Sequence, residues 1–259
     1  MQLIAVQTDI RWEDKPANHE HVRELLAAAP PPPGALAVLP EMCMTGFSMK
    51  VAKIDEGEAR PGEQFLSALA QEFGIFICAG LVTRADDGRG LNQSVTWAPD
   101  GSELARYSKC HPFSFAHEDR HYAKGDGPVL YEWAGLRVAP TICYDLRFPE
   151  LYRIAAGRGA QLYTVIANWP QRREAHWRAL LVARAIENQA WVIGVNRCGD
   201  DPWLHYGGAS LIIDPRGEII ADAGSGPGTI RAEVHLDALL DYRASFPALA
   251  DMRGEFVPV

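Results

Sequence analysis

No hydrophobic run in the chain is long enough to cross a bilayer, which takes about 20 consecutive apolar residues. The apolar stretch near the amino terminus, LIAVQT, is followed at once by the charged segment DIRWEDK. It is therefore also too short to be the apolar part of a signal peptide. We expect a cytoplasmic protein that has no membrane partner.

Cysteine is sparse and irregularly spaced. The cysteines are odd in number and include no CxxC pair, which argues against a disulfide framework and against a zinc site made of paired cysteines. We expect free thiols at all of these positions: Cys43, Cys78, Cys110, Cys143 and Cys198.

Dense basic segments are absent as well. The chain has 25 Lys plus Arg against 33 Asp plus Glu, a formal charge of −8, and no block that could neutralise a phosphate backbone. This argues against nucleic acid as a partner. Internal repeats, low-complexity tracts and linkers are also missing, and 259 residues suit one large core. We therefore predict a single domain over residues 1–259.

Short apolar runs that alternate with amphipathic segments fill most of the chain. Strand–helix alternation interrupted by hairpins is typical of mixed sheets with helices outside, so the pattern predicts a layered α/β fold. The predicted strands are 3–8, 35–41, 74–84, 161–168 and 191–197; the helices are 16–29, 61–73, one from about 149, and 173–189; and the hairpins are 92–109, 129–143 and 209–222.

A reactive side chain closes three of the apolar runs. Glu41 ends ALAVLPE, Lys109 ends ELARYSK, and Cys143 ends LRVAPTIC. Layered α/β folds assemble their sites at strand ends, so residues far apart in sequence can meet there. Each residue alone has an ordinary interpretation, because a strand cysteine is usually a small apolar residue and a terminal Glu or Lys is usually solvated.

Taken together, the three residue types suit acyl transfer. A thiol with a pKa near 8.5 is only about 3% thiolate at neutral pH, so a nucleophilic cysteine needs a base or a positive field. Glu41 could accept the Cys143 proton and return it to a departing amine. The Lys109 ammonium and the backbone N–H of Tyr144 could stabilise the oxyanion.

These motifs resemble those of the nitrilase superfamily of carbon–nitrogen hydrolases. AVLPEMCMTGF is similar to its glutamate motif, YSKCHPF to its lysine motif and TICYDLRFPEL to its cysteine motif, in the family's order, and ANWP and HWRALLVARAIENQ also look like family signatures. The resemblance implies a four-layer α-β-β-α sandwich with a Glu-Lys-Cys triad. It also implies a thioester intermediate, no cofactor, and a homodimer or higher homo-oligomer.

Within the superfamily, CYDLRFPEL and RAIENQ are most similar to the omega-amidase branch. That branch hydrolyses alpha-ketoglutaramate and alpha-ketosuccinamate to the dicarboxylate and ammonia. Related amidases that act on deaminated glutathione or on carbamoyl amino acids share much of these motifs and stay as alternatives. A catalytically inactive binding module on the same fold is a further alternative, against which the complete triad argues.

The segment HEDRH, His117 to His121, fits the H-E-x-x-H zinc pattern, which would need a helix with both histidines on one face. Its context in a loop of residues 110–128 argues against zinc, and we expect no metal. By the resemblance to the nitrilase superfamily, Glu118 instead matches a second glutamate, found in this loop of many members, that orients the lysine or the substrate amide. The alternative is a solvated loop acid.

The resemblance also points to residues that bind the substrate. Arg147, four residues after Cys143, and Asn168, at the end of the next strand, match positions that contact a substrate carboxylate in relatives, and a guanidinium fork suits that group. The predicted substrate is therefore a small amide that bears a carboxylate. Alternatively, Arg147 forms a structural ion pair with Glu150 or Asp145.

Overall fold

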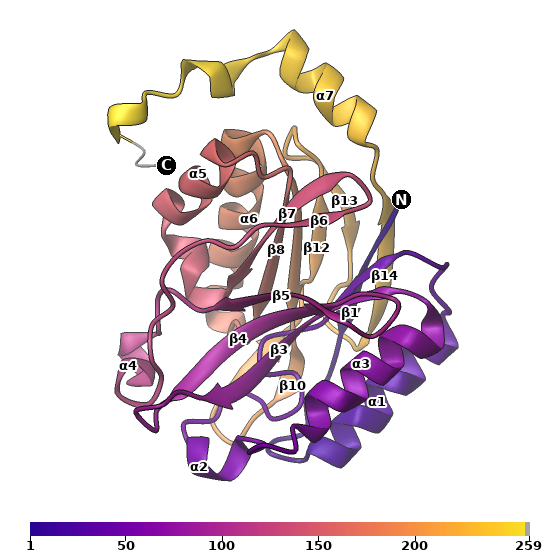
Figure 1. Ribbon diagram of the computed structural model, residues 1–259, viewed down its shortest axis with the longest axis vertical. Helices are drawn as coiled ribbons and strands as arrows, with labels where there is room; N and C mark the ends of the chain where they lie inside the picture. The colour runs from indigo at the N-terminus through magenta and orange to yellow at the C-terminus, as the bar shows by residue number, and fades with distance from the viewer. Residues whose placement is uncertain (257–259) are drawn as a thin grey trace.

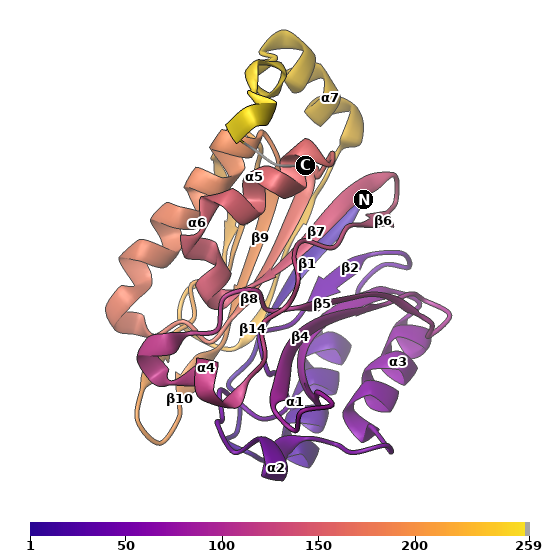
Figure 2. The same cartoon turned by 60° about the vertical axis from the view of Figure 1, so that its left-hand side comes forward.

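The computed structural model describes residues 1–256 and contains two six-stranded mixed sheets that face each other (Figure 1). The first sheet has the strand order β14-β1-β2-β3-β4-β5 and the second β13-β12-β9-β8-β7-β6. Figure 2 shows helices α1 and α3 outside the first sheet, and α5 and α6 outside the second. These four layers confirm the predicted α-β-β-α sandwich.

The first sheet comes mainly from the amino-terminal half, and its last strand from near the carboxyl end. Prolines in the first turn begin both covering helices, where a missing N–H costs nothing. The elements are β1 (Gln2–Gln7), α1 (Lys15–Ala28), β2 (Leu36–Val38), α2 (Val51–Ile54), α3 (Pro61–Phe73), β3 (Phe76–Arg84), β4 (Gly90–Trp97), β5 (Glu103–Ser108) and β14 (Gly228–Glu233).

The second sheet follows in the carboxyl-terminal half. Its elements are β6 (Tyr131–Trp133), β7 (Leu136–Ile142), α5 (Pro149–Gly157), β8 (Leu162–Ala167), α6 (Glu174–Asn188), β9 (Trp191–Asn196), β12 (Leu211–Ile213) and β13 (Ile219–Asp222). A separate two-stranded ribbon, β10 (Cys198–Asp200) and β11 (His205–Gly207), lies between β9 and β12 in sequence. Helix α7 (Leu236–Ser245) follows β14.

Alternate residues of the first sheet face different layers, as a strand period of two requires. Leu3 and Ala5 of β1 belong to a core cluster shared with the second sheet, whereas Ile4 and Val6 pack with residues of α1 and α3. The core between the sheets therefore draws on both halves of the chain. No helix among residues 1–256 is long and apolar enough to span a membrane.

The predicted hairpins are all present. β4 pairs with β5, β6 with β7, and β12 with β13, each antiparallel. The predicted strand 35–41 is shorter than expected, because regular pairing ends at Val38 and Pro40 to Met42 form the loop that carries Glu41. The β10–β11 ribbon, β14 and α7 were not predicted.

Candidate active site

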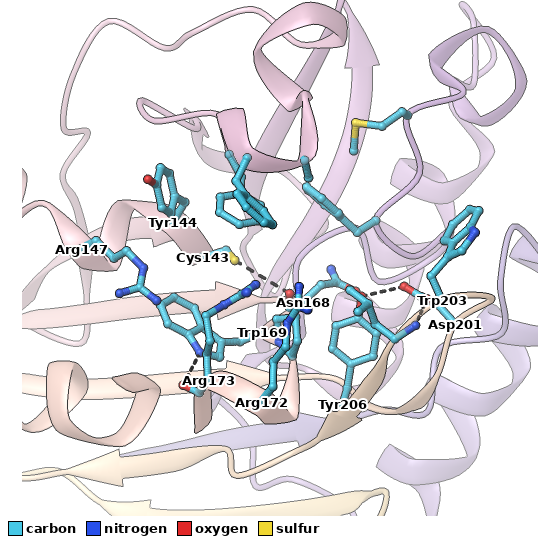
Figure 3. A pocket seen from close by; sticks show the side chains of 17 residues that line it. Cys143, Tyr144, Arg147, Asn168, Trp169, Arg172, Arg173, Asp201, Trp203 and Tyr206 are labelled. Atoms are coloured by element: carbon cyan, nitrogen blue, oxygen red, sulfur yellow. Dashed lines mark hydrogen bonds between the residues drawn. The ribbon is translucent and has the colours of Figure 1, made fainter. Parts of the chain in front are cut away.

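Three strand ends bring the predicted reactive residues together between the sheets. Glu41 follows β2, Lys109 follows β5, and Cys143 directly follows β7. Glu41 and Lys109 are almost fully buried, whereas Cys143 is half-buried and lines a cavity (Figure 3). The site is thus built from both sheets, with Glu41 and Lys109 from the first and Cys143 from the second.

Cys143 begins a 3-10 turn (Cys143–Arg147) with a backbone φ of 48°, in the left-handed region that non-glycine residues rarely occupy. The buried carboxylate of Asp145 supports this turn by accepting hydrogen bonds from the Ile142 N–H at 3.0 Å and the Tyr107 hydroxyl at 2.7 Å. It also accepts the His111 N–H at 2.9 Å. Asp145 therefore ties the cysteine turn to the segment around Lys109.

Glu41 is held by four groups. Its carboxylate accepts hydrogen bonds from Lys109 Nζ at 2.8 Å, Asn92 Nδ2 at 2.7 Å and the Asn168 N–H at 2.8 Å. Asn168 Nδ2 donates to the Glu41 carbonyl at 2.6 Å. Burial opposes ionisation, but the Lys109 charge and these hydrogen bonds outweigh it and lower the pKa of Glu41 below 4.5.

Lys109 and Glu118 form the second half of this charge cluster. Lys109 Nζ lies 2.9 Å from Glu118 Oε2, and Asn92 Nδ2 donates to Glu118 Oε1 at 2.9 Å. Burial raises the pKa of Glu118 and the Lys109 charge opposes that shift, while the charge on Glu41 adds to it. Burial lowers the pKa of Lys109, but the charges of Glu118 and Glu41 more than compensate, so Lys109 stays an ammonium ion.

The Cys143 thiol is neutral in this environment. Burial raises its pKa well above the ordinary value of a thiol, the Glu41 charge raises it further, and Lys109 offsets only part of the shift. A neutral thiol next to an ionised carboxylate is the arrangement that general-base catalysis requires. The geometry can therefore support nucleophilic attack by sulfur with Glu41 as proton acceptor.

The cavity beside Cys143 has a volume of about 250 Å³, with Cys143 and Asn168 lying between Arg147 and Trp203 (Figure 3). Apolar side chains make up much of its wall, and three arginines add positive charge. Its other lining residues include Phe47, Met49, Phe113, Phe115, Trp169, Leu204 and Tyr206, with Arg172 and Arg173. A small, negatively charged molecule suits this combination.

The predicted substrate residues differ in how they face this cavity. The side-chain amide of Asn168 is directed to Glu41, so its contact is with the candidate base. The backbone turn after Cys143 contains Tyr144, whose ring packs against Phe113 and Phe148. Arg147 lies over Trp169, at 4.7 Å from its ring centroid.

The alternative that Arg147 pairs with an acid is wrong within residues 1–256. Neither Glu150 nor Asp145 forms an ion pair with it, because Asp145 faces inward to Tyr107 and His111. The other polar contact of the Arg147 guanidinium is His176 Nδ1 at 3.3 Å. Arg147 therefore remains available to a ligand in the cavity.

HEDRH does not form the long helix that its zinc interpretation requires. Helix α4 (Glu118–His121) has a single turn, His117 precedes it in the left-handed region, and Glu118 is directed to Lys109. Residues 1–256 contain no group of three or more His, Cys, Asp or Glu placed to hold a metal ion.

Two contributors to the site were missed from the sequence. Asn92 entered the sequence analysis only as the first residue of the predicted hairpin 92–109, and Asp145 only as an alternative ion-pair partner of Arg147. The hairpin of residues 92–109 carried a usable signal for Asn92, since its register places Gln93 opposite Ser108 and hence Asn92 beside Lys109. No comparable local signal identifies Asp145, whose partners come from distant segments.

Known proteins resemble this chain over nearly its whole length. Residues 3–244 match the family model for carbon-nitrogen hydrolase. The chain is 39% identical to omega-amidase YafV of Escherichia coli strain K12 over 97% of this chain and 96% of that protein. It is 33% identical to 2-oxoglutaramate amidase of Bacillus subtilis strain 168, over 98% of each.

Two further similarities bear on substrate and fold. The chain is 34% identical to a deaminated glutathione amidase of Synechocystis, over 90% of this chain and 91% of that protein. The crystal structure of XC1258 from Xanthomonas campestris, a CN-hydrolase superfamily protein with an arsenic adduct in its active site, matches with a TM-score of 0.91 and 32% identity. That match covers 98% of this chain and 97% of the other.

Proposed function

The chain belongs to the carbon-nitrogen hydrolase family, as its motifs predicted, and we propose that within this family it is an omega-amidase. Its substrates in this proposal are 2-oxoglutaramate (alpha-ketoglutaramate) and 2-oxosuccinamate (alpha-ketosuccinamate), which it hydrolyses to the dicarboxylate and ammonia. The observation that carries the proposal is the buried Glu41–Lys109–Glu118 cluster beside Cys143, at a cavity lined by arginines.

In the first half of the reaction, Cys143 Sγ attacks the amide carbon while its proton passes to Glu41. The oxygen that becomes negative faces the Lys109 ammonium and the Tyr144 N–H, where each donor contributes about 3 to 4 kcal/mol. The carbon–nitrogen bond then breaks, and the nitrogen takes the proton from Glu41 and leaves as ammonia. The acyl group remains on sulfur as a thioester.

In the second half, a water molecule attacks the thioester while Glu41 accepts its proton. The carbon–sulfur bond breaks, the acid is released, and Glu41 returns the proton to the sulfur. Lys109 Nζ donates to Glu118 as well as to Glu41, and this second carboxylate keeps the ammonium in place through both halves. No cofactor takes part in these steps.

The experiment is an ammonia-release screen of 2-oxoglutaramate, 2-oxosuccinamate, glutamine, asparagine, deaminated glutathione, a nitrile and a carbamoyl amino acid. We expect the largest kcat/KM for the first two compounds. A larger value for deaminated glutathione would assign the chain to the amidases of that type, such as its Synechocystis relative. If the protein released ammonia from none of these compounds, the proposal would be overturned.

A second arm of the screen tests the zinc interpretation of HEDRH. Exhaustive chelation should leave the rate with 2-oxoglutaramate unchanged, because the proposed chemistry uses only side chains. Inactivation by the chelator and recovery with added zinc would instead support a metal-dependent hydrolase.

A further inference from the structure

Positive charge in the cavity is not balanced by the protein. Arg147, Arg172 and Arg173 all line it, and none of the three forms an ion pair with an acid within residues 1–256. In a chain with a formal charge of −8, such a group of unpaired arginines is unusual. Like charges around a small cavity repel each other, and an anion placed among them relieves that repulsion.

Asp201 is the acidic residue among those that line the cavity, and it does not neutralise the arginines. Its Oδ1 accepts the N–H groups of Trp203 and Leu204, both at 2.8 Å. Its Oδ2 accepts the Tyr206 hydroxyl at 2.6 Å. Asp201 therefore stabilises the β10–β11 turn, and the three arginines that line the cavity outnumber this one carboxylate.

Arg173 and Arg147 are the more enclosed arginines of the cavity. Both are half-buried, whereas Arg172 is exposed. Arg173 also packs against an aromatic ring of the loop opposite. Its guanidinium carbon lies 5.4 Å from the centre of the Phe113 ring, in the loop that also carries Glu118. Burial lowers the pKa of Arg173, as do the charges of Arg172 and Arg147, and Cys143 is close enough to affect it.

The backbone of Arg173 is held firmly. Its N–H donates to the Pro170 carbonyl at 2.9 Å, and its carbonyl accepts Trp169 Nε1 at 2.7 Å. Because Trp169 directly follows Asn168, which binds Glu41, the position of Arg173 is fixed relative to the candidate base. The backbone from which the side chain extends is therefore held in place, and the planar fork of a guanidinium loses little freedom per hydrogen bond when it binds a carboxylate.

We infer that Arg173 determines substrate specificity by holding the carboxylate at the end of the substrate remote from the amide. This inference rests on the proposed function and deepens it. Arg147, over Trp169, is a second contact on the same side of the cavity (Figure 3). The sequence pointed to Arg147 for this task, whereas the structure points first to Arg173.

The same arginines account for a preference for 2-oxo acids over 2-amino acids. Glutamine carries an ammonium group beside its carboxylate, and 2-oxoglutaramate carries an uncharged ketone there. In a cavity with three arginines and a fully engaged Asp201, the ammonium meets repulsion without a compensating partner. Removing Arg173 should therefore weaken the preference as well as the binding.

The test compares Arg173→Gln with Arg11→Gln, an exposed arginine that does not line the cavity. We expect Arg173→Gln to lower kcat/KM for 2-oxoglutaramate by about ten- to a hundredfold, the effect of losing a charged hydrogen bond. Propionamide, which has no carboxylate, should change by less than about twofold, and the ratio of 2-oxoglutaramate to glutamine turnover should fall. Arg11→Gln should change kcat/KM for 2-oxoglutaramate by less than about twofold, as is usual for an exposed charge.

Binding of glutarate, measured by calorimetry on the intact protein, separates this inference from the proposed reaction. The Kd should rise about tenfold or more in Arg173→Gln, with an unchanged melting temperature as the control for folding. If wild-type protein releases no ammonia from 2-oxoglutaramate but binds glutarate through Arg173, the proposed reaction fails and the inference stands. If the reaction occurs and Arg173→Gln behaves as wild type, the inference fails. An equal loss on propionamide, or an equal loss in Arg11→Gln, would also overturn it.

Discussion

The Cys143 side chain is oriented by the protein but is not ionised by it. Its raised pKa keeps the thiol protonated, and its positive φ costs on the order of 1 kcal/mol for a residue with a Cβ. The Asp145 carboxylate maintains this conformation through the Ile142 N–H. Because the field of Lys109 alone does not produce a thiolate, the proposed chemistry depends on proton transfer to Glu41.

Only Cys143 should be irreplaceable among the cysteines. Cys143→Ala should lower ammonia release by at least about a thousandfold, because no other group can form the thioester. Cys110→Ala and Cys198→Ala should keep most of the activity, since neither residue lines the cavity. Mass spectrometry after iodoacetamide treatment should find Cys143 modified first. Modification of another cysteine with parallel loss of activity would contradict this assignment.

The dependence of Cys143 on Glu41 predicts a change in how alkylation varies with pH. In Glu41→Gln, only the thiolate fraction can react. Loss of the Glu41 charge removes one of the causes that raise the pKa of Cys143, but burial, the largest cause, remains and keeps that fraction small at pH 7. The iodoacetamide rate should therefore rise about tenfold per pH unit from pH 7 to 9.

Wild-type protein should react faster at pH 7 and vary less with pH, because Glu41 has a lowered pKa and is ready to accept the proton. Rates measured for both proteins across this range provide the check. The same steep rise in both would mean that Glu41 is not the base.

Position at the ends of apolar runs, together with the motif resemblance, led to the prediction of the triad, whereas the residues that support it depend on tertiary packing. Glu41, Lys109 and Cys143 are reactive side chains at the ends of apolar runs, a local pattern that the sequence displays. Nothing in the local sequence distinguishes Asn92 from other strand residues. It contributes to the site because its side-chain amide donates hydrogen bonds to both Glu41 and Glu118. Arg173 likewise becomes a candidate for substrate binding only once the structure shows that it lines the cavity and that Asp201 is hydrogen-bonded elsewhere.

Strand β3 positions the loop that carries Glu41. The Gly80 N–H donates to the Pro40 carbonyl at 3.1 Å, and the Gly80 carbonyl accepts the Cys43 N–H at 3.0 Å. A Cβ on Gly80 would lie 2.5 Å from the Glu41 Cα and 2.4 Å from the Met42 nitrogen, both backbone atoms. The absence of a side chain at Gly80 therefore permits this close approach.

Gly80→Ala should reduce both stability and activity. Overpacking against backbone costs about 1 to 3 kcal/mol, and displacement of Glu41 should lower kcat by about tenfold or more. Gly226→Ala is the matched control, because a Cβ there meets no atom within 4 Å. Thermal melting and kcat of both variants provide the measurement. Wild-type values in Gly80→Ala would mean that β3 and the loop that carries Glu41 can move apart without affecting the site.

Elements with strong local signals were predictable, and those without them were not. The β4–β5 hairpin was visible from its PDG turn, and helices α1, α3 and α5 from prolines in their first turn. Helix α7 buries one residue, Leu239, so it has no clear apolar stripe. β10 and β11 have three residues each, which is too short to show an alternation.

At the scale of the whole molecule, the site exists only while the two sheets stay together. Glu41, Lys109 and Asn92 belong to the first sheet and its loops, and Cys143 and Asn168 to the second. The Asn168 N–H donates directly to Glu41, so one hydrogen bond of the candidate base crosses between the halves. The core between the sheets likewise includes residues of both. This arrangement favours the single domain predicted for residues 1–259.

A single shared core predicts that activity and structure are lost together in urea. Ammonia release, tryptophan fluorescence and far-ultraviolet circular dichroism should give coincident transitions, because neither sheet can keep its inner face buried without the other. Two separated transitions, with activity lost in the first, would mean that the halves unfold as independent units.

The same unfolding curves at several protein concentrations test the predicted homo-oligomer. If dissociation is coupled to unfolding, the urea midpoint rises as the protein concentration rises. A midpoint that does not change with concentration would indicate that the monomer is the unit that unfolds and that the site needs no second copy.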